Sequence, residues 1–202
     1  MSIAPKLVTI FGGSGFVGRY VAQRMAKEGW RVRVAVRRPN EALFVKTYGD
    51  VGQVEPILAN IRDEKSTRAA IIGADAVVNC VGILNETSKQ KFTDLQSKGA
   101  SQIAKLATEC GVKTFVHFSA IGADINSHSK YLKSKAEGEE MVKASFKNAV
   151  ILRPSIVFGA EDQFFNRFAT MAKLSPLIPL VGGETKFQPV YVDDIAKAAV
   201  KG

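Results

Sequence analysis

A glycine-rich turn separates a short apolar run from an amphipathic helix near the start of this chain. Residues 6–11 form the apolar run, and Gly12, Gly15 and Gly18 then recur at every third position as GxxGxxG. Apolar side chains at helical spacing follow over residues 16–28. A strand that enters a helix through such a loop begins a βαβ unit, which needs glycine for the tight turn and for close helix–strand packing. The pattern therefore predicts a parallel α/β fold.

The alternation of strand and helix continues along most of the chain. Short β-branched runs predict further strands at residues 31–36, 54–59, 75–81, 114–118 and 149–152. Longer stretches with helical spacing predict further helices at residues 63–72, 92–110 and 129–146. Strands that are apolar almost throughout are expected where helices cover both faces of a sheet. We therefore expect a doubly wound parallel sheet, the Rossmann fold.

The pattern loosens after Pro154, which predicts a domain boundary. We interpret residues 1–155 as a nucleotide-binding Rossmann domain and residues 156–202 as the start of a small C-terminal lobe. Within this second part, the pattern predicts two helices and one extended segment, at residues 163–173, 193–201 and 187–192. Three aromatic side chains there fit either internal packing or a docking face for a partner: Phe164, Phe165 and Phe168.

Composition excludes several classes of function. The 202 residues include Lys+Arg 28 against Asp+Glu 19, a net charge of +9, yet the charge is scattered and we expect no nucleic-acid partner. No apolar run reaches the roughly 18 residues of a membrane span, and no His/Cys/Asp/Glu cluster has metal-ligand spacing. Cys80 and Cys110 lie in apolar stretches, and the start lacks a signal-peptide layout. We expect a cytoplasmic protein with neither a metal nor a transmembrane segment.

The glycine loop predicts a cradle for the pyrophosphate of a dinucleotide. A helix that starts directly after the loop presents free N–H groups to the phosphates. Besides the three glycines, the residues expected around the phosphates are Ser14, Phe16 and Val17.

The end of the second predicted strand indicates which dinucleotide is bound. Arg37 and Arg38 stand where NAD sites usually carry an acidic residue for the ribose 2′-hydroxyl, and an arginine there accommodates a 2′-phosphate. We therefore predict NADP(H) over NAD(H), the alternative being that both arginines belong to a solvated strand end. Arg19 either adds charge near the phosphates or is an exposed helix residue.

Further motifs follow the glycine loop in a fixed order, and together they resemble a known family. They are NCVG at residues 79–82, Ser119 after a strand, YLKSK at 131–135, RPSIVFG at 153–159 and QPVYVDDIA at 188–196. In this order they resemble the extended or atypical short-chain dehydrogenase/reductases over essentially the whole chain. Four longer segments are similar to the nucleotide-binding accessory subunits of respiratory complex I and their bacterial NAD-dependent epimerase/dehydratase-like homologues: residues 11–21, 49–53, 129–139 and 158–169.

The resemblance implies a catalytic set of Ser119, Tyr131 and Lys135. In the family the tyrosine is the acid or base, the lysine also binds the nicotinamide ribose, and the serine polarises the substrate. The spacing itself supports part of this, because Lys135 lies on the same helical face as Tyr131. Its positive charge is expected to lower the pKa of a phenol that ordinarily titrates near 10.

The resemblance also implies further contacts with the cofactor. Asn60 and Ile61 would meet the adenine, Val81 and Gly82 the adenine ribose, and Pro154 and Ile156 the nicotinamide. Asn60 departs from the family, which often has Asp at this position, but it keeps an acceptor oxygen.

Three hypotheses about function remain open. The first is an NADP(H)-binding protein with a structural nucleotide, associated with complex I or another membrane-associated protein and peripheral to the inner membrane on its cytoplasmic side. The second is an active NAD(P)-dependent reductase, epimerase or dehydratase on a small carbonyl or nucleotide-sugar substrate. The third is a dinucleotide-sensing regulator. Family members continue into a complete C-terminal lobe, so the resemblance implies that this chain is truncated and does not name the substrate.

Overall fold

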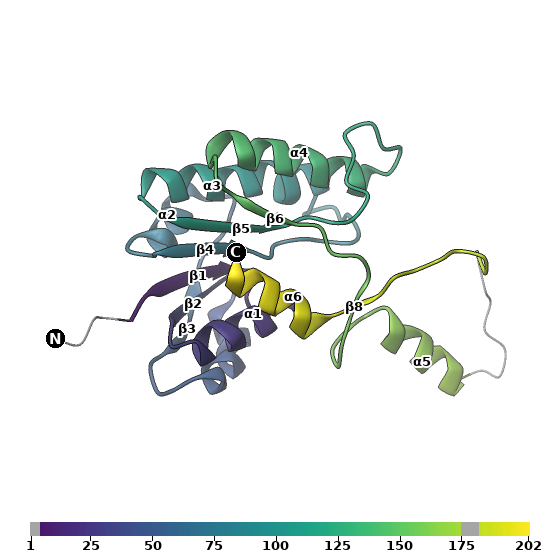
Figure 1. Ribbon diagram of the computed structural model, residues 1–202, viewed down its shortest axis with the longest axis horizontal. Helices are drawn as coiled ribbons and strands as arrows, with labels where there is room; N and C mark the ends of the chain where they lie inside the picture. The colour runs from purple at the N-terminus through teal and green to yellow at the C-terminus, as the bar shows by residue number, and fades with distance from the viewer. Residues whose placement is uncertain (1–4, 175–181) are drawn as a thin grey trace.

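The computed structural model describes residues 5–174 and 182–202, and its centre is a six-stranded parallel sheet (Figure 1). The strand order is β3-β2-β1-β4-β5-β6. The strands are β1 Leu7–Phe11, β2 Arg31–Val36, β3 Val54–Leu58, β4 Ala76–Asn79, β5 Thr114–Phe118 and β6 Val150–Leu152. All five neighbouring pairs are parallel, as the apolar character of the strands predicted. The predicted doubly wound Rossmann fold is confirmed.

Helices cover both faces of the sheet (Figure 1). One layer contains α2 Glu64–Ile71, the π-helical turn η2 Thr93–Lys98, α3 Gly99–Glu109 and α4 Lys130–Ser145. The other contains α1 Phe16–Lys27, the 3₁₀ helix η1 Pro39–Tyr48 and α6 Val192–Lys201. Each layer buries its own hydrophobic cluster against the sheet. Apolar residues at helical spacing therefore define the layers, since each helix turns that stripe toward the strands.

Two parts of the fold differ from the sequence prediction. The 3₁₀ helix η1 was not predicted, although it buries Ala42 and adds Val45 to the hydrophobic cluster of its layer. The helix predicted at residues 92–110 is observed as η2 followed by α3, so its first part is wider than an α-helix.

A segment after β6 forms a small structure of its own. Strands β7 Val157–Phe158 and β8 Val190–Tyr191 pair in parallel, and between them α5 Phe165–Leu174 has no buried residue. Six aromatic side chains pack against one another there while remaining 37–56% exposed: Phe158, Phe164, Phe165, Phe168, Phe187 and Tyr191. We call this set the aromatic cluster.

The last helix of the chain packs against the first (Figure 1). Nε and Nη2 of Arg24 donate hydrogen bonds to the two carboxylate oxygens of Asp193 on α6. Ala196 and Ala199 are buried in the same hydrophobic cluster as α1. Helix α6 therefore covers the sheet, although it lies within the predicted C-terminal lobe, and the division into two domains stays a prediction.

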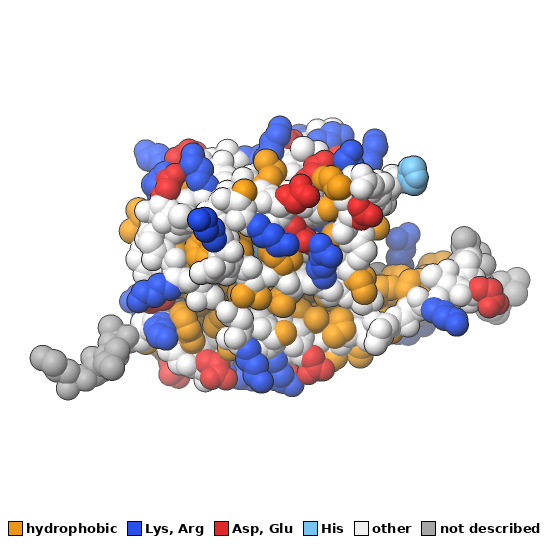
Figure 2. Space-filling view, turned by 45° about the horizontal axis from the view of Figure 1, so that its top comes forward, with side chains coloured by type: hydrophobic (Ala, Val, Ile, Leu, Met, Phe, Trp, Pro, Cys, Tyr) orange, Lys and Arg blue, Asp and Glu red, His pale blue; other side chains and the backbone are white. Residues whose placement is uncertain are grey.

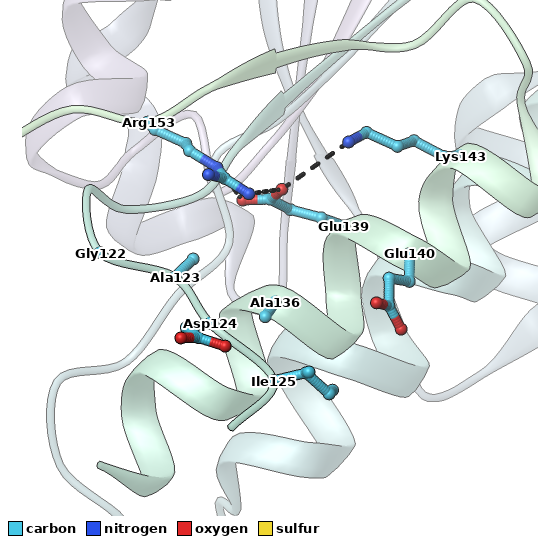
Figure 3. Close-up of a pocket in the computed structure, with 9 residues that line it drawn as sticks. All are labelled: Gly122, Ala123, Asp124, Ile125, Ala136, Glu139, Glu140, Lys143 and Arg153. Atoms are coloured by element: carbon cyan, nitrogen blue, oxygen red, sulfur yellow. Dashed lines mark hydrogen bonds and ion pairs between the residues drawn. The ribbon is translucent and has the colours of Figure 1, made fainter. Parts of the chain in front are cut away.

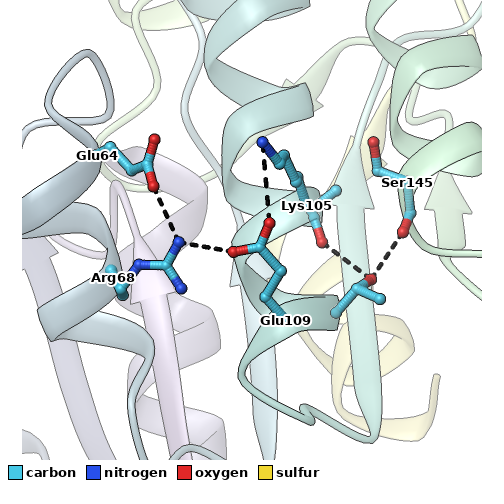
Figure 4. Close-up of polar contacts among 7 residues, drawn as sticks. Glu64, Arg68, Lys105, Glu109 and Ser145 are labelled. Carbon is cyan, nitrogen blue, oxygen red and sulfur yellow. Dashed lines mark hydrogen bonds and ion pairs between the residues drawn. The ribbon is translucent and has the colours of Figure 1, made fainter.

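Polar contacts at one end of the other layer tie its helices together (Figure 4). Arg68 on α2 donates to Glu64 at 2.9 Å and to Glu109 on α3 at 2.6 Å. The hydroxyl of Thr108 donates to the carbonyl oxygen of Ser145 at 2.7 Å, which links α3 to α4. These contacts fix the neighbouring helices relative to each other at the end of the sheet opposite to the glycine loop.

Candidate nucleotide-binding site

The carboxyl ends of β1 and β4 meet at the point where the strand order changes direction. Crossovers leave these two strands toward opposite faces of the sheet, so a crevice opens between the loops that follow them. Gly12 follows β1 with a φ of 73°, and a Cβ added there would lie 3.2 Å from the backbone of Cys80 and Val81. Glycine at this position therefore allows the two loops to approach each other.

The first turn of α1 has no side-chain cap. Gly15 is the N-cap residue, and the first turn contains no acidic side chain. The N–H groups of residues 16–18 consequently lack helical acceptors at the positive end of the helix. A Cβ on Gly15 would lie 3.2 Å from the carbonyl oxygen of Gly12, which is a close contact, and within 4 Å of no other heavy atom outside its chain neighbours. This arrangement fits a phosphate group, and the contact of Ser14, Phe16 and Val17 with a nucleotide stays a prediction.

The two arginines predicted to bind a 2′-phosphate, Arg37 and Arg38, lie directly after β2 at the same edge of the sheet. Arg38 has a side chain that is 75% exposed, and its Nη1 donates to Glu41 at 3.0 Å. Exposed pairs of this kind are weak, so Arg38 can exchange its partner for an anion. Arg19 is held against the glycine loop, because its Nη2 donates to the carbonyl oxygen of Ser14 at 3.2 Å.

The loops after β3 and β4 are fixed by asparagine side chains. The side-chain oxygen of Asn60 accepts from the N–H of Arg62 at 3.2 Å, and Ile61 is buried beside it. The side-chain oxygen of Asn79 accepts from the N–H of Val81 at 3.1 Å. Each asparagine therefore uses its side-chain oxygen to fix the backbone of its own loop at the carboxyl edge of the sheet.

Tyr131 and Lys135 lie one turn apart on α4, as their spacing predicted. The Nζ of Lys135 is 6.0 Å from the centroid of the Tyr131 ring and donates to the carbonyl oxygen of Phe118 at 3.0 Å. A Cβ on Gly82 would lie 3.3 Å from the same Nζ, so the lysine reaches the loop after β4. Burial lowers the pKa of Lys135 to about 8.

The prediction that Lys135 lowers the pKa of the Tyr131 phenol is wrong in this structure. Burial raises the pKa of Tyr131 instead of leaving it lowered by the ammonium. The reason is that the ring is largely removed from water, which disfavours the phenolate, while the ammonium is 6.0 Å from the ring centroid. In this arrangement the Tyr131 side chain is a neutral phenol, and its catalytic role stays a prediction.

Ser119 directly follows β5, but its hydroxyl oxygen is buried. It has no hydrogen-bond partner of suitable geometry among the described residues, although it lies near enough to Glu139 to lower the pKa of that carboxyl. Its backbone N–H donates to the carbonyl oxygen of Leu152 at 2.8 Å, which ties the end of β5 to β6. The structure therefore does not bring this hydroxyl into hydrogen-bonding contact with Tyr131.

Pro154 and Ile156, predicted to back the nicotinamide, are half-buried after β6. The carbonyl oxygen of Pro154 accepts from the N–H of Ile121 at 2.9 Å. The segment after β6 is thereby joined to the loop after β5, and its contact with the nicotinamide stays a prediction.

Gln96 connects the crevice to α4 and was not singled out in the sequence. It lies in η2 with 1% exposure, its Nε2 donates to Ser134 Oγ at 2.8 Å, and its Oε1 accepts from the N–H of Ile83 at 3.4 Å. The Ser134 hydroxyl in turn donates to the carbonyl oxygen of Tyr131 at 2.8 Å. The local sequence carries no clear signal for this role, because five of the six residues of η2 are polar.

A cavity of about 480 Å³ lies between the loop after β5 and α4 (Figure 3). Its lining residues are Gly122, Ala123, Asp124, Ile125, Ala136, Glu139, Glu140, Lys143 and Arg153. None of these residues belongs to the glycine loop, so the cavity is a separate feature beside the helix that carries Tyr131.

Metal sites and membrane-spanning helices are both absent from the described ranges. Within residues 5–174 and 182–202, no group of three or more His, Cys, Asp or Glu side chains is placed to hold a metal ion. No helix in these ranges has both the length and the apolar character required to cross a membrane. On the face drawn in Figure 2, Lys and Arg are dispersed among acidic and apolar side chains.

Comparison with known proteins agrees with this geometry. The family model described as "NAD dependent epimerase/dehydratase family" matches residues 8–201. The chain belongs to this family.

Curated relatives of this epimerase/dehydratase-family chain include complex I subunits. "NADH dehydrogenase [ubiquinone] 1 alpha subcomplex subunit 9, mitochondrial" of Arabidopsis thaliana is 38% identical over 98% of this chain and 50% of its own length. The protein of that name from Mus musculus is 37% identical, over 98% and 53%. "Ceramide reductase" of Caulobacter vibrioides is 28% identical, over 96% and 60%. The chain thus spans about half the length of the complex I relatives that it matches.

Solved structures share the fold of the epimerase/dehydratase-family chain. Pen from Bacillus thuringiensis superposes with a TM-score of 0.83 at 18% identity, over 100% of this chain and 66% of that one. The Bordetella bronchiseptica enzyme WbmH in complex with NAD+ gives a TM-score of 0.74 at 20% identity, over 97% and 71%. Both likenesses concern the fold alone.

Proposed function

We propose that this chain binds a dinucleotide across the carboxyl ends of β1 and β4, and that it prefers NADP(H) to NAD(H). The observation that carries the proposal is the uncapped first turn of α1, which begins directly after the glycine loop with Gly15 as its N-cap. Free N–H groups at a helix N-terminus, with the helix dipole behind them, favour a pyrophosphate. The exposed Arg37 and Arg38 favour the 2′-phosphate of NADP(H) over the hydroxyl of NAD(H).

The role proposed for the nucleotide is structural, in a protein that associates with a complex I-like assembly. The relatives named as NADH dehydrogenase subunits support this association. The aromatic cluster supports it independently, because exposed apolar patches of this kind commonly mark contacts with partners. Such a protein would lie peripherally at the inner membrane, on its cytoplasmic side.

An active oxidoreductase is the second candidate, favoured by Tyr131 and Lys135. A bound nicotinamide would supply or accept hydride, while Tyr131, a neutral phenol whose pKa burial raises further, would donate a proton to the substrate oxygen. Lys135 would hold the nicotinamide ribose through its ammonium. Polarisation of substrate by Ser119 would require a rearrangement, since its hydroxyl oxygen is buried. The relative named ceramide reductase supports this candidate.

Replacement of both arginines after β2 tests the preference for NADP(H). We expect Arg37→Ala combined with Arg38→Ala to weaken NADPH binding about tenfold or more, or about 1.4 kcal/mol, and to leave NADH nearly unchanged. Isothermal titration calorimetry measures both affinities, and Lys105→Ala on α3 is a matched loss of exposed charge. Equal losses for both nucleotides would contradict the 2′-phosphate assignment.

Two further measurements separate the candidate roles. Mass spectrometry of the purified protein identifies any nucleotide that co-purifies. A turnover screen with NADPH and aldehydes, ketones and quinones then distinguishes the roles: activity favours the oxidoreductase, and tight binding without turnover favours the structural nucleotide.

A further inference from the structure

An ion pair between a buried carboxylate and a half-exposed arginine joins α4 to the end of β6, one helical turn from Lys135. Glu139 is only 2% exposed, and both of its carboxylate oxygens accept hydrogen bonds from Arg153, at 2.8 Å from Nε and 2.7 Å from Nη2 (Figure 3). Lys143 contributes more distantly, with its Nζ 4.0 Å from Glu139 Oε2. Arg153 follows directly on β6, so the pair connects a strand end to the helix that carries Tyr131 and Lys135.

The Glu139 carboxylate is kept charged by its surroundings. Burial alone would raise the pKa of Glu139, but the hydrogen bonds from Arg153 and the positive charges of Arg153 and Lys143 hold it below its ordinary value. An ion pair whose arginine is half exposed is weak evidence for a role in stability, because solvent screens the attraction. Its position beside a second buried charge indicates another role.

That second charge is the Lys135 ammonium, which is 5% exposed. The titratable groups that act on it come from three elements. Cys80, after β4, is a neutral thiol because burial raises its pKa to about 12. His117, on β5, is a neutral imidazole because burial and the lysine itself lower its pKa to about 3. On α4, Tyr131 is a neutral phenol, and Glu139 acts on Lys135 in the direction opposite to burial.

Glu139 is therefore the full negative charge among these groups. Side chains at i and i+4 of a helix lie next to each other. A carboxylate in this position favours the ammonium form of Lys135 against the cost of burying it.

We propose that Glu139, held by Arg153, is a positioning residue for the nucleotide site: its carboxylate keeps the Lys135 side chain charged and in place below the loop after β4. Arg153 has the complementary role of keeping Glu139 ionised and fixing the β6 segment against α4. The consequence for nucleotide affinity rests on the proposed function. The effect on Lys135 does not, because it is a property of the chain without ligand.

The first experiment measures the titration of Lys135 in the absence of nucleotide. NMR of protein labelled with [¹³C]lysine follows its ε-carbon against pH, with the signal assigned by its loss in Lys135→Arg. We expect Glu139→Gln to lower the proton affinity of Lys135 about tenfold, which is one pKa unit. Glu139→Asp, which keeps the charge, should restore most of it. Lys143→Met, a matched change on the exposed side of the pair, should leave it within twofold of wild type.

The second experiment measures NADPH affinity of the same variants against pH by calorimetry. Raising the pH removes the proton of Lys135 and should therefore weaken NADPH binding. In Glu139→Gln this loss should occur about one pH unit lower than in wild type, the same tenfold difference in proton concentration. If Glu139→Gln does not fold, Glu139→Gln combined with Arg153→Gln replaces the pair by two neutral amides and should give the same titration of Lys135.

The outcomes separate the two proposals. A folded variant without the Glu139 charge in which Lys135 titrates as in wild type would overturn the positioning role, whatever the nucleotide result. Failure of the wild-type protein to bind NADPH or NADH would instead overturn the proposed function, and the Lys135 titration would still decide the role of Glu139.

Discussion

His117 lies in β5 with its ring buried, and it shows how one residue can order a loop that it does not touch. Its Nδ1 is 3.1 Å from Nδ2 of Asn79, whose side-chain oxygen accepts from the N–H of Val81. An amide that donates to Nδ1 requires an unprotonated nitrogen there, so the neutral ring is part of the arrangement. The loop after β4 is thus oriented through two side chains from neighbouring strands.

This arrangement predicts a loss of stability in acid. Burial, reinforced by the Lys135 ammonium, lowers the pKa of His117 to about 3 in the folded protein, while an unfolded histidine titrates near 6.5. Between these values the unfolded state binds the additional proton, so its free energy falls relative to the folded state as the pH falls. We expect His117 to remove about 1.4 kcal/mol of stability for each pH unit between about 6 and 4.

Urea denaturation between pH 7 and 4 measures this dependence. His117→Gln should show a shallower decrease than wild type, because the slope due to the carboxylates remains and that due to the histidine is gone. His128→Gln, in an exposed loop, should keep the wild-type slope. Parallel curves for wild type and His117→Gln would mean that the ring is protonated in the folded state.

At the scale of an element, the glycines of the glycine loop are equally spaced in sequence but have different surroundings in the structure. Gly15 has ordinary backbone angles, with φ −73° and ψ 176°, and a Cβ there would have one close neighbour, the carbonyl oxygen of Gly12 at 3.2 Å. Gly18 packs so closely that a Cβ would collide with the carbonyl of Gly12 and lie 2.7 Å from the Cα of Gly13. One position serves the approach of a ligand, and the other serves helix–strand packing.

Alanine at these two positions should therefore give opposite results. Gly18→Ala should lower the free energy of unfolding by about 1–3 kcal/mol, because backbone atoms must move to admit the methyl group. Gly15→Ala should change it by less than about 1 kcal/mol, yet weaken NADPH binding about tenfold or more, because the methyl group occupies the approach to the phosphates. Denaturation and calorimetry on both variants check this, and a Gly15→Ala protein that binds normally would show that the phosphates lie elsewhere.

The sequence predicted the elements whose periodicity is strong, and it failed where structure depends on distant partners. Apolar runs located all six strands of the main sheet to within two residues at either end. The 3₁₀ helix η1 was missed because Pro39 reads as a turn and its few buried residues carry no clear period. The spacing of Tyr131 and Lys135 predicted their pairing, but the raised pKa of Tyr131 depends on burial that only the packed α4 creates.

The same limit applies to the site. Glu139 and Arg153 are separated by 14 positions, and nothing in either segment indicates that β6 ends beside that turn of α4. Gln96 reaches Ser134 across 38 positions in the same way. Contacts of this kind follow from the order of the strands and the layers of helices, which local patterns do not specify.

At the scale of the whole molecule, α6 completes the helical layer that contains α1. Ala196 and Ala198 lie on the same short helix, but the first is fully buried and the second is exposed. We expect Ala196→Asp to lower the free energy of unfolding by more than about 2 kcal/mol, because an unpaired carboxylate is brought against the sheet. Ala198→Asp should stay within about 0.5 kcal/mol of wild type. Similar denaturation midpoints for the two variants would mean that α6 is not required by the Rossmann core.

The contact between Arg24 and Asp193 spans 169 positions of the chain. A ribosome that adds about 5–20 residues each second needs roughly 10–30 s to travel that distance. Throughout this interval the side of the nascent sheet that α6 will cover stays open, and its apolar side chains face solvent or a chaperone. The order of synthesis therefore gives the newly made protein a period of vulnerability to aggregation, which lasts until α6 emerges and docks on α1.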